Sequence, residues 1–291
     1  MPTLPLISIV LPTHNGARYL QGAIDSCLQQ TWPNLEVILV DDASDDLKTV
    51  RMLDSQSDPR VRLIRLPENV KLPRALNAGF KHAQGELLTW TSDDNLYRPT
   101  ALATMAYEIV KDEADFVYAH ATTWDENDRP IGSIALRPPD QLPLSNCIGA
   151  CFLYKREVYE ETGDFNPEML LTEDYDYWIR VSKHFRMKLI DADLYIYRQH
   201  AATMTQRHGS ASIEAMVDKT RTTHFTPLEI LEAEGWREYR RDNYRAAGSR
   251  FARVLLRHPR SPHLYRPAVI SLMPGFLRRT MVQIKSLGKK K

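Results

Sequence analysis

Residues 85–95, with the sequence GELLTWTSDDN, place the strongest limit on the fold, because an apolar run stops there at two adjacent carboxylates. Residues 86–91 have the β-branched and aromatic content of a buried strand, and Pro99 opens the helical pattern that follows. We therefore expect Asp93 and Asp94 at the carboxyl end of a strand. In open α/β sheets, ligands bind in the crevice outside these strand ends.

Two neighbouring acids repel each other, which raises one pKa or destabilises the loop unless a cation compensates. Mg²⁺ and Mn²⁺ prefer oxygen ligands, and Mg²⁺ commonly takes one or two protein carboxylates and fills its shell with water and substrate phosphate. The plainer interpretation is a solvated turn in which Asp93 caps the next helix. The dipeptide alone favours the turn, so the rest of the chain must decide.

The pattern of apolar residues gives the outline of an α/β fold. Apolar runs predict strands at residues 6–11, 35–40, 61–66, 86–91, 115–118 and 148–154, and short strands within residues 189–197. Helical spacing predicts helices at residues 17–30, 72–83, 102–110, 173–182 and from residue 212 onward. Alternation of strand and helix predicts a mostly parallel sheet with right-handed crossovers, flanked by helices. Residues 119–143 lose this pattern and are expected to form a hairpin or loop.

The length and charge indicate one sizeable domain with an appendage. The chain has 291 residues, 43% apolar, and a formal net charge of +1. Residues 225–291 hold 15 Lys and Arg against 5 Asp and Glu, a balance of +10, whereas residues 1–224 hold 23 against 32, a balance of −9. Such asymmetry predicts that the basic part contacts something anionic.

Cysteine usage and hydropathy indicate a cytoplasmic protein. Cys27, Cys147 and Cys151 are odd in number and lack the spacing of metal ligands, so we interpret them as small apolar residues in a reducing compartment. The sequence has no run of eighteen apolar residues and no signal-peptide pattern.

Several short motifs follow one another in a characteristic order. They are SIVLPTHN at residues 8–15, QTWP at 30–33, VDDAS at 40–44, the segment 77–86, TSDDN at 91–95, GDF at 163–165, TEDYDYW at 172–178 and YRQH at 197–200. As an ordered set they resemble the family 2 glycosyltransferases, which are inverting, nucleotide-sugar-dependent hexosyltransferase-type enzymes of the GT-A fold. The resemblance covers residues 6–205, and the basic tail lies outside it. It implies a Rossmann-like domain over residues 1–224.

The resemblance implies a nucleoside site at the ends of the first two strands. The residues expected to enclose the nucleoside are Pro12, Thr13, His14, Asn15 and Asp42. Asp42 would accept a hydrogen bond from uracil N3 or a ribose hydroxyl, and His14 would stack on the base. The alternative is that Thr13 and Asn15 satisfy a turn while the preceding acid, Asp41, caps the helix after Ser44.

The same resemblance gives the carboxylate pair a metal-binding role. Asp94 is the expected ligand of Mg²⁺ or Mn²⁺, and Asp93 would bond the ribose or reach the metal through water. His200 would complete the metal shell or bond a phosphate, and Arg198 would clamp the diphosphate. The metal would stabilise charge that develops on the departing nucleoside diphosphate. Lys71 and Arg74 are further phosphate contacts or solvated surface residues.

Asp174 is the catalytic base that the resemblance implies. Inversion at an anomeric carbon needs one base to deprotonate the acceptor hydroxyl, in a single displacement without a covalent enzyme intermediate. Glu173 would orient that base or the acceptor. The competing account makes Thr172 or Asp174 a helix cap.

The basic tail over residues 225–291 has more than one interpretation. Helical spacing with interleaved arginines recurs at residues 228–256 and 270–287, the latter with Arg278, Arg279 and Lys285. Such helices suit an anionic membrane at the inner face of the plasma membrane, or they pack on the catalytic domain or form a homodimer. Nucleic-acid binding is not expected, because neither a recognised fold nor an aromatic platform supports it.

The expected substrates are a nucleoside diphosphate sugar, commonly UDP-linked, and a glycan or lipid-linked acceptor, as in bacterial surface polysaccharide synthesis. Two alternatives stay open. A sugar-nucleotide pyrophosphorylase has a similar sheet, but residues 12–17 lack its glycine-rich basic phosphate loop. A catalytically silent relative would serve as a binding or assembly subunit, which the retention of the expected site residues disfavours.

Overall fold

The computed structural model describes residues 4–111 and 113–273, which fall into two units. The sheet unit combines Met1–Pro139 with Asn146–Thr220, and the helical unit combines Asp140–Ser145 with Arg221–Lys291. α7 (Met204–His224) contributes residues to both units.

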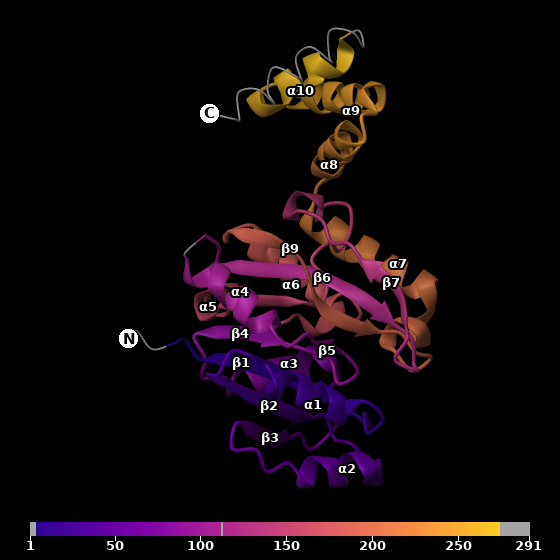
Figure 1. The fold of residues 1–291 in the computed structure, drawn as a ribbon. Helices are drawn as coiled ribbons and strands as arrows, with labels where there is room; N and C mark the ends of the chain where they lie inside the picture. The colour runs from indigo at the N-terminus through magenta and orange to yellow at the C-terminus, as the bar shows by residue number, and fades with distance from the viewer. Residues whose placement is uncertain (1–3, 112, 274–291) are drawn as a thin grey trace. The chain divides into compact units, whose positions relative to one another are not determined.

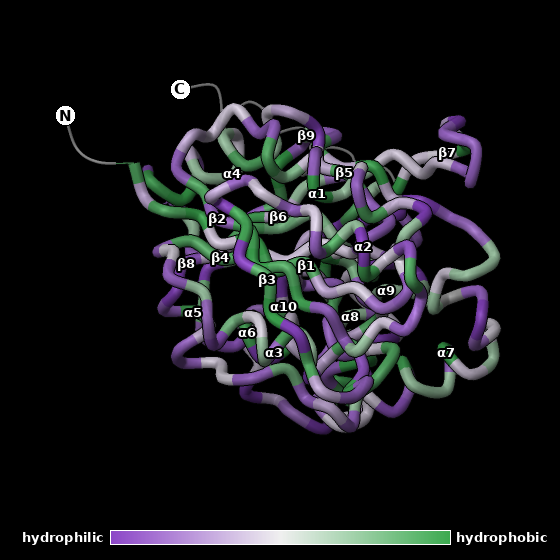
Figure 2. Tube along the Cα trace, turned by 90° about the horizontal axis from the view of Figure 1, so that it is seen from below, coloured by the Kyte–Doolittle hydropathy of each residue, from purple (hydrophilic) through white to green (hydrophobic). Residues whose placement is uncertain are grey.

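Four parallel strands form the first half of the sheet. They are β1 (Ile7–Thr13), β2 (Leu35–Asp41), β3 (Val61–Arg65) and β4 (Leu87–Trp90). They lie side by side in the order β3-β2-β1-β4 (Figure 1). Every residue of β1 is buried, as expected of a strand covered on both faces. Figure 2 shows hydrophobic residues along these strands and hydrophilic residues in the surrounding loops.

The strands of this half are joined by helices. These are α1 (Leu20–Leu28), α2 (Leu47–Asp54), α3 (Leu72–Phe80) and, after β4, α4 (Ala101–Val110). The close packing of α3 on β1 requires a glycine, because a Cβ on Gly79 would lie 2.4 Å from the Cγ1 atom of Val10. The predicted sheet with flanking helices is confirmed.

The second half of the sheet is mixed. It consists of β5 (Leu96–Tyr97), β6 (Phe116–Trp124), β7 (Pro130–Ile134), β8 (Phe152–Lys155) and β9 (Met187–Arg198). β8 joins the two halves, because it pairs antiparallel with both β4 and β6. β9 is parallel to β6 and antiparallel to β5. β6 and β7 form the hairpin that the sequence allowed for residues 119–143.

Aromatic packing fixes α6 (Glu173–Ser182), whose first turn carries the predicted base. Trp178 is fully buried, with its ring centroid 4.5 Å from that of Phe152 in β8 and 4.9 Å from that of Phe116 in β6. The loop between α5 (Arg156–Thr162) and α6 is also fixed, since the Asn77 amide exchanges hydrogen bonds of 2.8 and 2.9 Å with the backbone of Phe165.

The helical unit contains α8 (Pro227–Arg240), α9 (Tyr244–Arg257) and α10 (Pro262–Leu272). Phe251, Ala247 and Leu264 are fully buried in its small core. The helical pattern predicted at residues 228–256 is divided at Asp242, which has a φ of 58°.

Most of the basic segment predicted at residues 270–287, including Arg278, Arg279 and Lys285, lies outside the described residues. No helix among the described residues has both the length and the hydropathy needed to cross a bilayer.

Candidate active site

The carboxyl ends of β1 and β4 meet through a side-chain hydrogen bond. The Thr13 hydroxyl donates to the Asp93 carboxylate over 2.5 Å. Gly16 leaves room for this contact, because a Cβ there would lie 2.0 Å from an Asp93 oxygen. Burial and the neighbouring charge of Asp94 raise the pKa of Asp93 to about 7.

Asp94 and His200 form the second contact at this edge. The Nε2 atom of His200 lies 3.0 Å from Oδ2 of Asp94, although the two residues are 106 positions apart. Burial raises the pKa of Asp94, and the hydrogen bond and charge of His200 oppose that effect. The loops after β4 and β9 therefore meet at one carboxylate–imidazole pair.

This pair fits a divalent cation that also binds phosphate. Neighbouring ligands of an octahedral ion with bonds of about 2.1 Å lie roughly 3 Å apart, which matches the Asp94–His200 separation. A cation would also relieve the repulsion and desolvation that raise the pKa of both carboxyl groups. Within the described ranges, no group of three or more His, Cys, Asp or Glu side chains is arranged to hold a metal. The protein therefore offers two ligands, and substrate and water would supply the others.

Arg198 is bound to the protein rather than exposed to solvent. Its Nε donates to the Asp94 carbonyl over 3.0 Å, its backbone N–H donates to Asn95 Oδ1 over 2.8 Å, and its guanidinium pairs with the Asp128 carboxylate. The side chain is 5% exposed, and its guanidinium carbon lies 4.4 Å from the centre of the Tyr19 ring. These contacts fix the backbone of Asp94 and the side chain of Asn95. Sequence reasoning did not predict this positioning role of Arg198.

The Asp42 side chain shapes the loop that precedes α3. Its two oxygens accept hydrogen bonds from the backbone N–H groups of Val70, over 2.7 Å, and Lys71, over 3.0 Å. Lys71 has a φ of 71° and an exposed side chain at the start of α3. A carboxylate has about four acceptor positions, so these bonds leave capacity for a base or ribose.

The segment after β1 packs against the segment after β2. Nδ1 of His14 lies 2.9 Å from the Asp42 carbonyl oxygen, and the Asn15 side-chain oxygen accepts from the backbone N–H groups of Asp45 and Asp46. Pro12 lies within β1 and is buried. α2 is capped by Asp46, while Asp41 instead accepts from the Ser44 backbone N–H over 2.9 Å.

Arg74 is an exposed residue in the first turn of α3. Its side chain lines a pocket of about 430 Å³. Asn77 of α3, Lys81 and His82 just after that helix, and Asp164 also line this pocket. None of the acids at the edge of the sheet lines that pocket.

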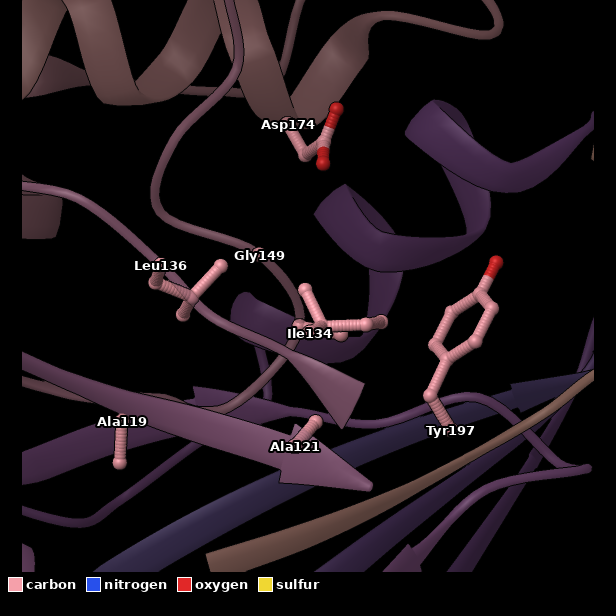
Figure 3. A pocket seen from close by; sticks show the side chains of 8 residues that line it. Ala119, Ala121, Ile134, Leu136, Gly149, Asp174 and Tyr197 are labelled. Carbon is pink, nitrogen blue, oxygen red and sulfur yellow. The ribbon is translucent and has the colours of Figure 1, made fainter. Parts of the chain in front are cut away.

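Asp174 faces a different pocket, of about 200 Å³ (Figure 3). Its carboxylate accepts hydrogen bonds from the Asn146 side-chain amide over 2.8 Å and the Tyr175 backbone N–H over 2.6 Å. Burial raises its pKa. Thr172 is the N-cap residue, but its hydroxyl bonds Thr220 instead of capping the helix. The other lining residues are Ala119, Ala121, Ile134, Leu136, Gly149, Ala150 and Tyr197.

Consecutive residues of β9 connect the two parts of the site. Tyr197 lines the Asp174 pocket, and the next residue, Arg198, contacts the Asp94 backbone. The structure thus brings Asp93, Asp94 and His200 together, and the carboxyl end of β9 contributes both to this group and to the pocket that Asp174 of α6 lines.

Glu173 is buried beside Asp174 and is 5% exposed. Its Oε2 atom has no hydrogen-bond partner among the described residues. Burial and the charge of Asp174 raise the pKa of Glu173 to about 8. Burial and the neighbouring charge thus both favour the protonated form of Glu173.

We expect Glu173→Gln to stabilise the protein at alkaline pH. The pKa of Glu173 in the folded state lies above its unfolded value of 4.5, so the folded state binds the proton more tightly than the unfolded chain does. The free energy of unfolding therefore falls as the pH rises from about 4.5 to about 8. The neutral amide should add roughly 2–4 kcal/mol to the free energy of unfolding at pH 8.5 and much less at pH 5.5. Urea denaturation at both pH values measures the difference. Glu168→Gln, at an exposed glutamate, is the matched control, and an equal gain there would contradict the assignment.

Parallel strands with acids at their carboxyl edge and flanking helices form a Rossmann-like α/β fold, and the likeness to solved glycosyltransferase structures makes it a GT-A fold. The chain belongs to glycosyl transferase family 2, because the model of that family matches residues 8–163. The predicted family and fold are confirmed.

Sequence and structure comparisons agree with this assignment. The chain is 29% identical to an uncharacterized glycosyltransferase of Rickettsia conorii over 246 residues, which cover 79% of this chain and 40% of that protein. It is 32% identical to an uncharacterized glycosyltransferase of Rickettsia prowazekii over 220 residues, 69% of this chain and 66% of the other. This chain thus spans less than two thirds of either relative.

The structure also resembles Staphylococcus aureus TarS 1–349 in complex with UDP-GlcNAc. The TM-score is 0.58 at 16% sequence identity, over 95% of this chain and 91% of that one. At this identity the likeness concerns the fold.

Proposed function

We propose that the chain transfers a sugar from a nucleoside diphosphate sugar, UDP-linked, to a hydroxyl of a glycan or lipid-linked acceptor, with inversion, in bacterial surface polysaccharide synthesis. The observation that supports this proposal is the carboxyl end of β9, where Tyr197 lines the Asp174 pocket and the next residue, Arg198, bonds the backbone of Asp94, which pairs with His200. The UDP and UDP-GlcNAc complexes of TarS, which shares the fold, support the choice of donor.

In this proposal the donor lies across the ends of β1, β2 and β4. Asp42 and His14 contact the nucleoside, and Asp93 contacts the ribose. Asp94 and His200 would hold Mg²⁺ or Mn²⁺, and the metal would supply positive charge for the departing diphosphate. Arg198 holds the Asp94 backbone in place through its 3.0 Å hydrogen bond.

Asp174 acts as the general base. One carboxylate oxygen of Asp174 takes the proton of the acceptor hydroxyl while the hydroxyl oxygen bonds to the anomeric carbon. The bond from the anomeric carbon to the diphosphate breaks on the opposite side, so the configuration inverts in one step. Asn146 orients the carboxylate through its 2.8 Å hydrogen bond, and Glu173 is buried next to it.

Product analysis tests this proposal directly. Purified protein with Mn²⁺ and UDP-GlcNAc should release UDP slowly to water and faster when an acceptor is present. The anomeric configuration of the transferred sugar, read by NMR, should be opposite to that of the donor. Retention of configuration would exclude the single displacement. UDP release from none of a panel of UDP-sugars would exclude the UDP-linked donor.

The helical unit supports a second proposal, contact with an anionic membrane at the inner face of the plasma membrane. Tyr265, Val269 and Leu272 share one face of α10 by their spacing and are 48%, 52% and 72% exposed. The acids of this unit are largely engaged, for example Asp140 by Arg240 and Glu234 by Arg250. The arginines of this unit outnumber its acids, so the unit carries positive charge that an anionic lipid surface would attract.

We expect Val269→Asp combined with Leu272→Asp to reduce binding to vesicles of 30% phosphatidylserine by about tenfold. The apolar face of α10 would lose buried area, and the two new acids would meet the negative lipid surface. Vesicle flotation at low and high salt measures the effect. Leu47→Asp, at a leucine of α2 that is 67% exposed, is the control. Equal flotation of all three proteins, or a salt-independent dimer in light scattering, would favour a protein interface instead.

A further inference from the structure

The pocket beside Asp174 is almost entirely apolar. Ala121 of β6 and Ile134 of β7 are register partners in the hairpin, and both line the pocket with Leu136. In Figure 3 the Asp174 carboxylate extends from above toward these side chains, with the Tyr197 ring at one side. Among the described residues that line the pocket, Asp174 carries the only charge, and no lysine or arginine contributes to it.

The apolar wall is held in place before any ligand binds. The Leu136 backbone N–H donates to Nδ1 of His120 over 3.0 Å, and the Arg137 carbonyl accepts from the Tyr118 hydroxyl over 2.7 Å. Gly149 has a φ of 72°, and a Cβ there would lie 2.9 Å from Leu136 Cδ2. Leu136 is therefore fixed between the hairpin and the 147–150 segment.

The size and chemistry of this pocket restrict its occupant. A volume of about 200 Å³ is below the roughly 300–1,000 Å³ typical of pockets for larger ligands, and it suits one sugar ring. An anionic ring would meet the Asp174 carboxylate without a compensating cation. A fully hydroxylated ring would bury hydroxyl groups against alanine, isoleucine and leucine without partners.

We infer that the pocket binds an uncharged acceptor sugar that carries a methyl-bearing substituent, with the methyl group against Ala121, Ile134 and Leu136 and the attacking hydroxyl at Asp174. This inference rests on the proposed function, because it takes Asp174 to face the acceptor. Two sources supply the same chemistry, a 6-deoxyhexose through its C6 methyl and an N-acetylhexosamine through its acetamido methyl. The ring of Tyr197 offers a stacking surface for the C–H face of the sugar.

Saturation-transfer NMR on the full chain with Mg²⁺ and UDP tests the inference. The matched pairs of probes are L-rhamnose with L-mannose, and N-acetylglucosamine with glucose. One methyl-bearing member should bind about 10- to 100-fold more tightly than its partner, as a hydrophobic pocket discriminates against an added hydroxyl. The strongest saturation should fall on its methyl protons. The pair that shows the difference identifies the source of the methyl group.

Substitutions at two positions separate the pocket from other surfaces. Leu136→Asn, similar in size but polar, should remove the preference, whereas Leu136→Met should keep it. Ala121→Leu should fill the space and abolish the methyl signal. Equal binding within both pairs, absence of any saturation, or an unchanged preference in Leu136→Asn would overturn the inference.

The outcome also distinguishes the pocket assignment from the proposed transfer reaction. Loss of methyl selectivity in a protein that still releases UDP from the donor contradicts the pocket assignment alone. Methyl selectivity in a protein that releases no UDP supports the pocket and contradicts the transfer reaction.

Discussion

Asp174→Asn should lower the rate of sugar transfer by about 10²- to 10⁴-fold, the range for a lost general base. The amide cannot accept the acceptor proton. It is similar in shape to the carboxylate, and its single oxygen can keep one of the two hydrogen bonds that Asp174 accepts through separate oxygens from Asn146 and the Tyr175 backbone. Nucleotide affinity should therefore change less than about twofold, because the donor contacts lie at the ends of β1, β2 and β4. Steady-state kinetics with a UDP-sugar, together with UDP titration by calorimetry, separates the two effects.

The pH profile adds a second criterion to this prediction. Burial raises the pKa of Asp174, so wild-type activity should decline as the pH falls through that raised value. The residual activity of Asp174→Asn should lack this decline. Asp54→Asn, at an exposed acid of α2, serves as the control and should retain wild-type kinetics. A kcat within about tenfold of the wild-type value would remove Asp174 from the role of base.

Local sequence patterns predicted the parallel half of the fold well. The apolar runs at residues 6–11 and 35–40 predicted β1 and β2, as the composition of buried parallel strands requires, although β1 continues through Pro12 to Thr13 and β2 includes Asp41. β5 was missed because its two residues exist as a strand only through pairing with β9. The sequence predicted short strands within residues 189–197. In the structure β9 is one continuous strand, because it pairs with β6 on both sides of two register shifts.

The sequence predicted the candidate site less completely than it predicted the fold. The motifs located the acids at the sheet edge, and their catalytic and binding roles stay predictions. Contacts that depend on distant segments had no local signal. The Asp128–Arg198 pair joins the β6–β7 turn to β9, and Asn146 reaches Asp174 from a loop with no recognisable motif. Tertiary structure alone reveals that Arg198 supports the Asp94 backbone.

Asp94→Asn should abolish metal-dependent nucleotide binding and reduce transfer by at least about 10²-fold. The substitution removes the anionic member of the Asp94–His200 pair and leaves one imidazole, a weak site for Mg²⁺ by itself. Wild-type protein should bind UDP more tightly when Mg²⁺ or Mn²⁺ is added. The variant should bind UDP equally with the metal and with EDTA, at the affinity that the wild-type protein shows in EDTA.

Unfolding is not expected to cause this loss. Burial raises the pKa of Asp94 despite the opposing contact with His200, so the folded state disfavours its charged form. A neutral asparagine should consequently leave the melting temperature unchanged or raise it. Calorimetric titration and thermal unfolding of the same preparation decide between the explanations. A well-folded Asp94→Asn protein that keeps Mg²⁺-dependent UDP affinity and normal turnover would show that the metal, if one is used, binds elsewhere.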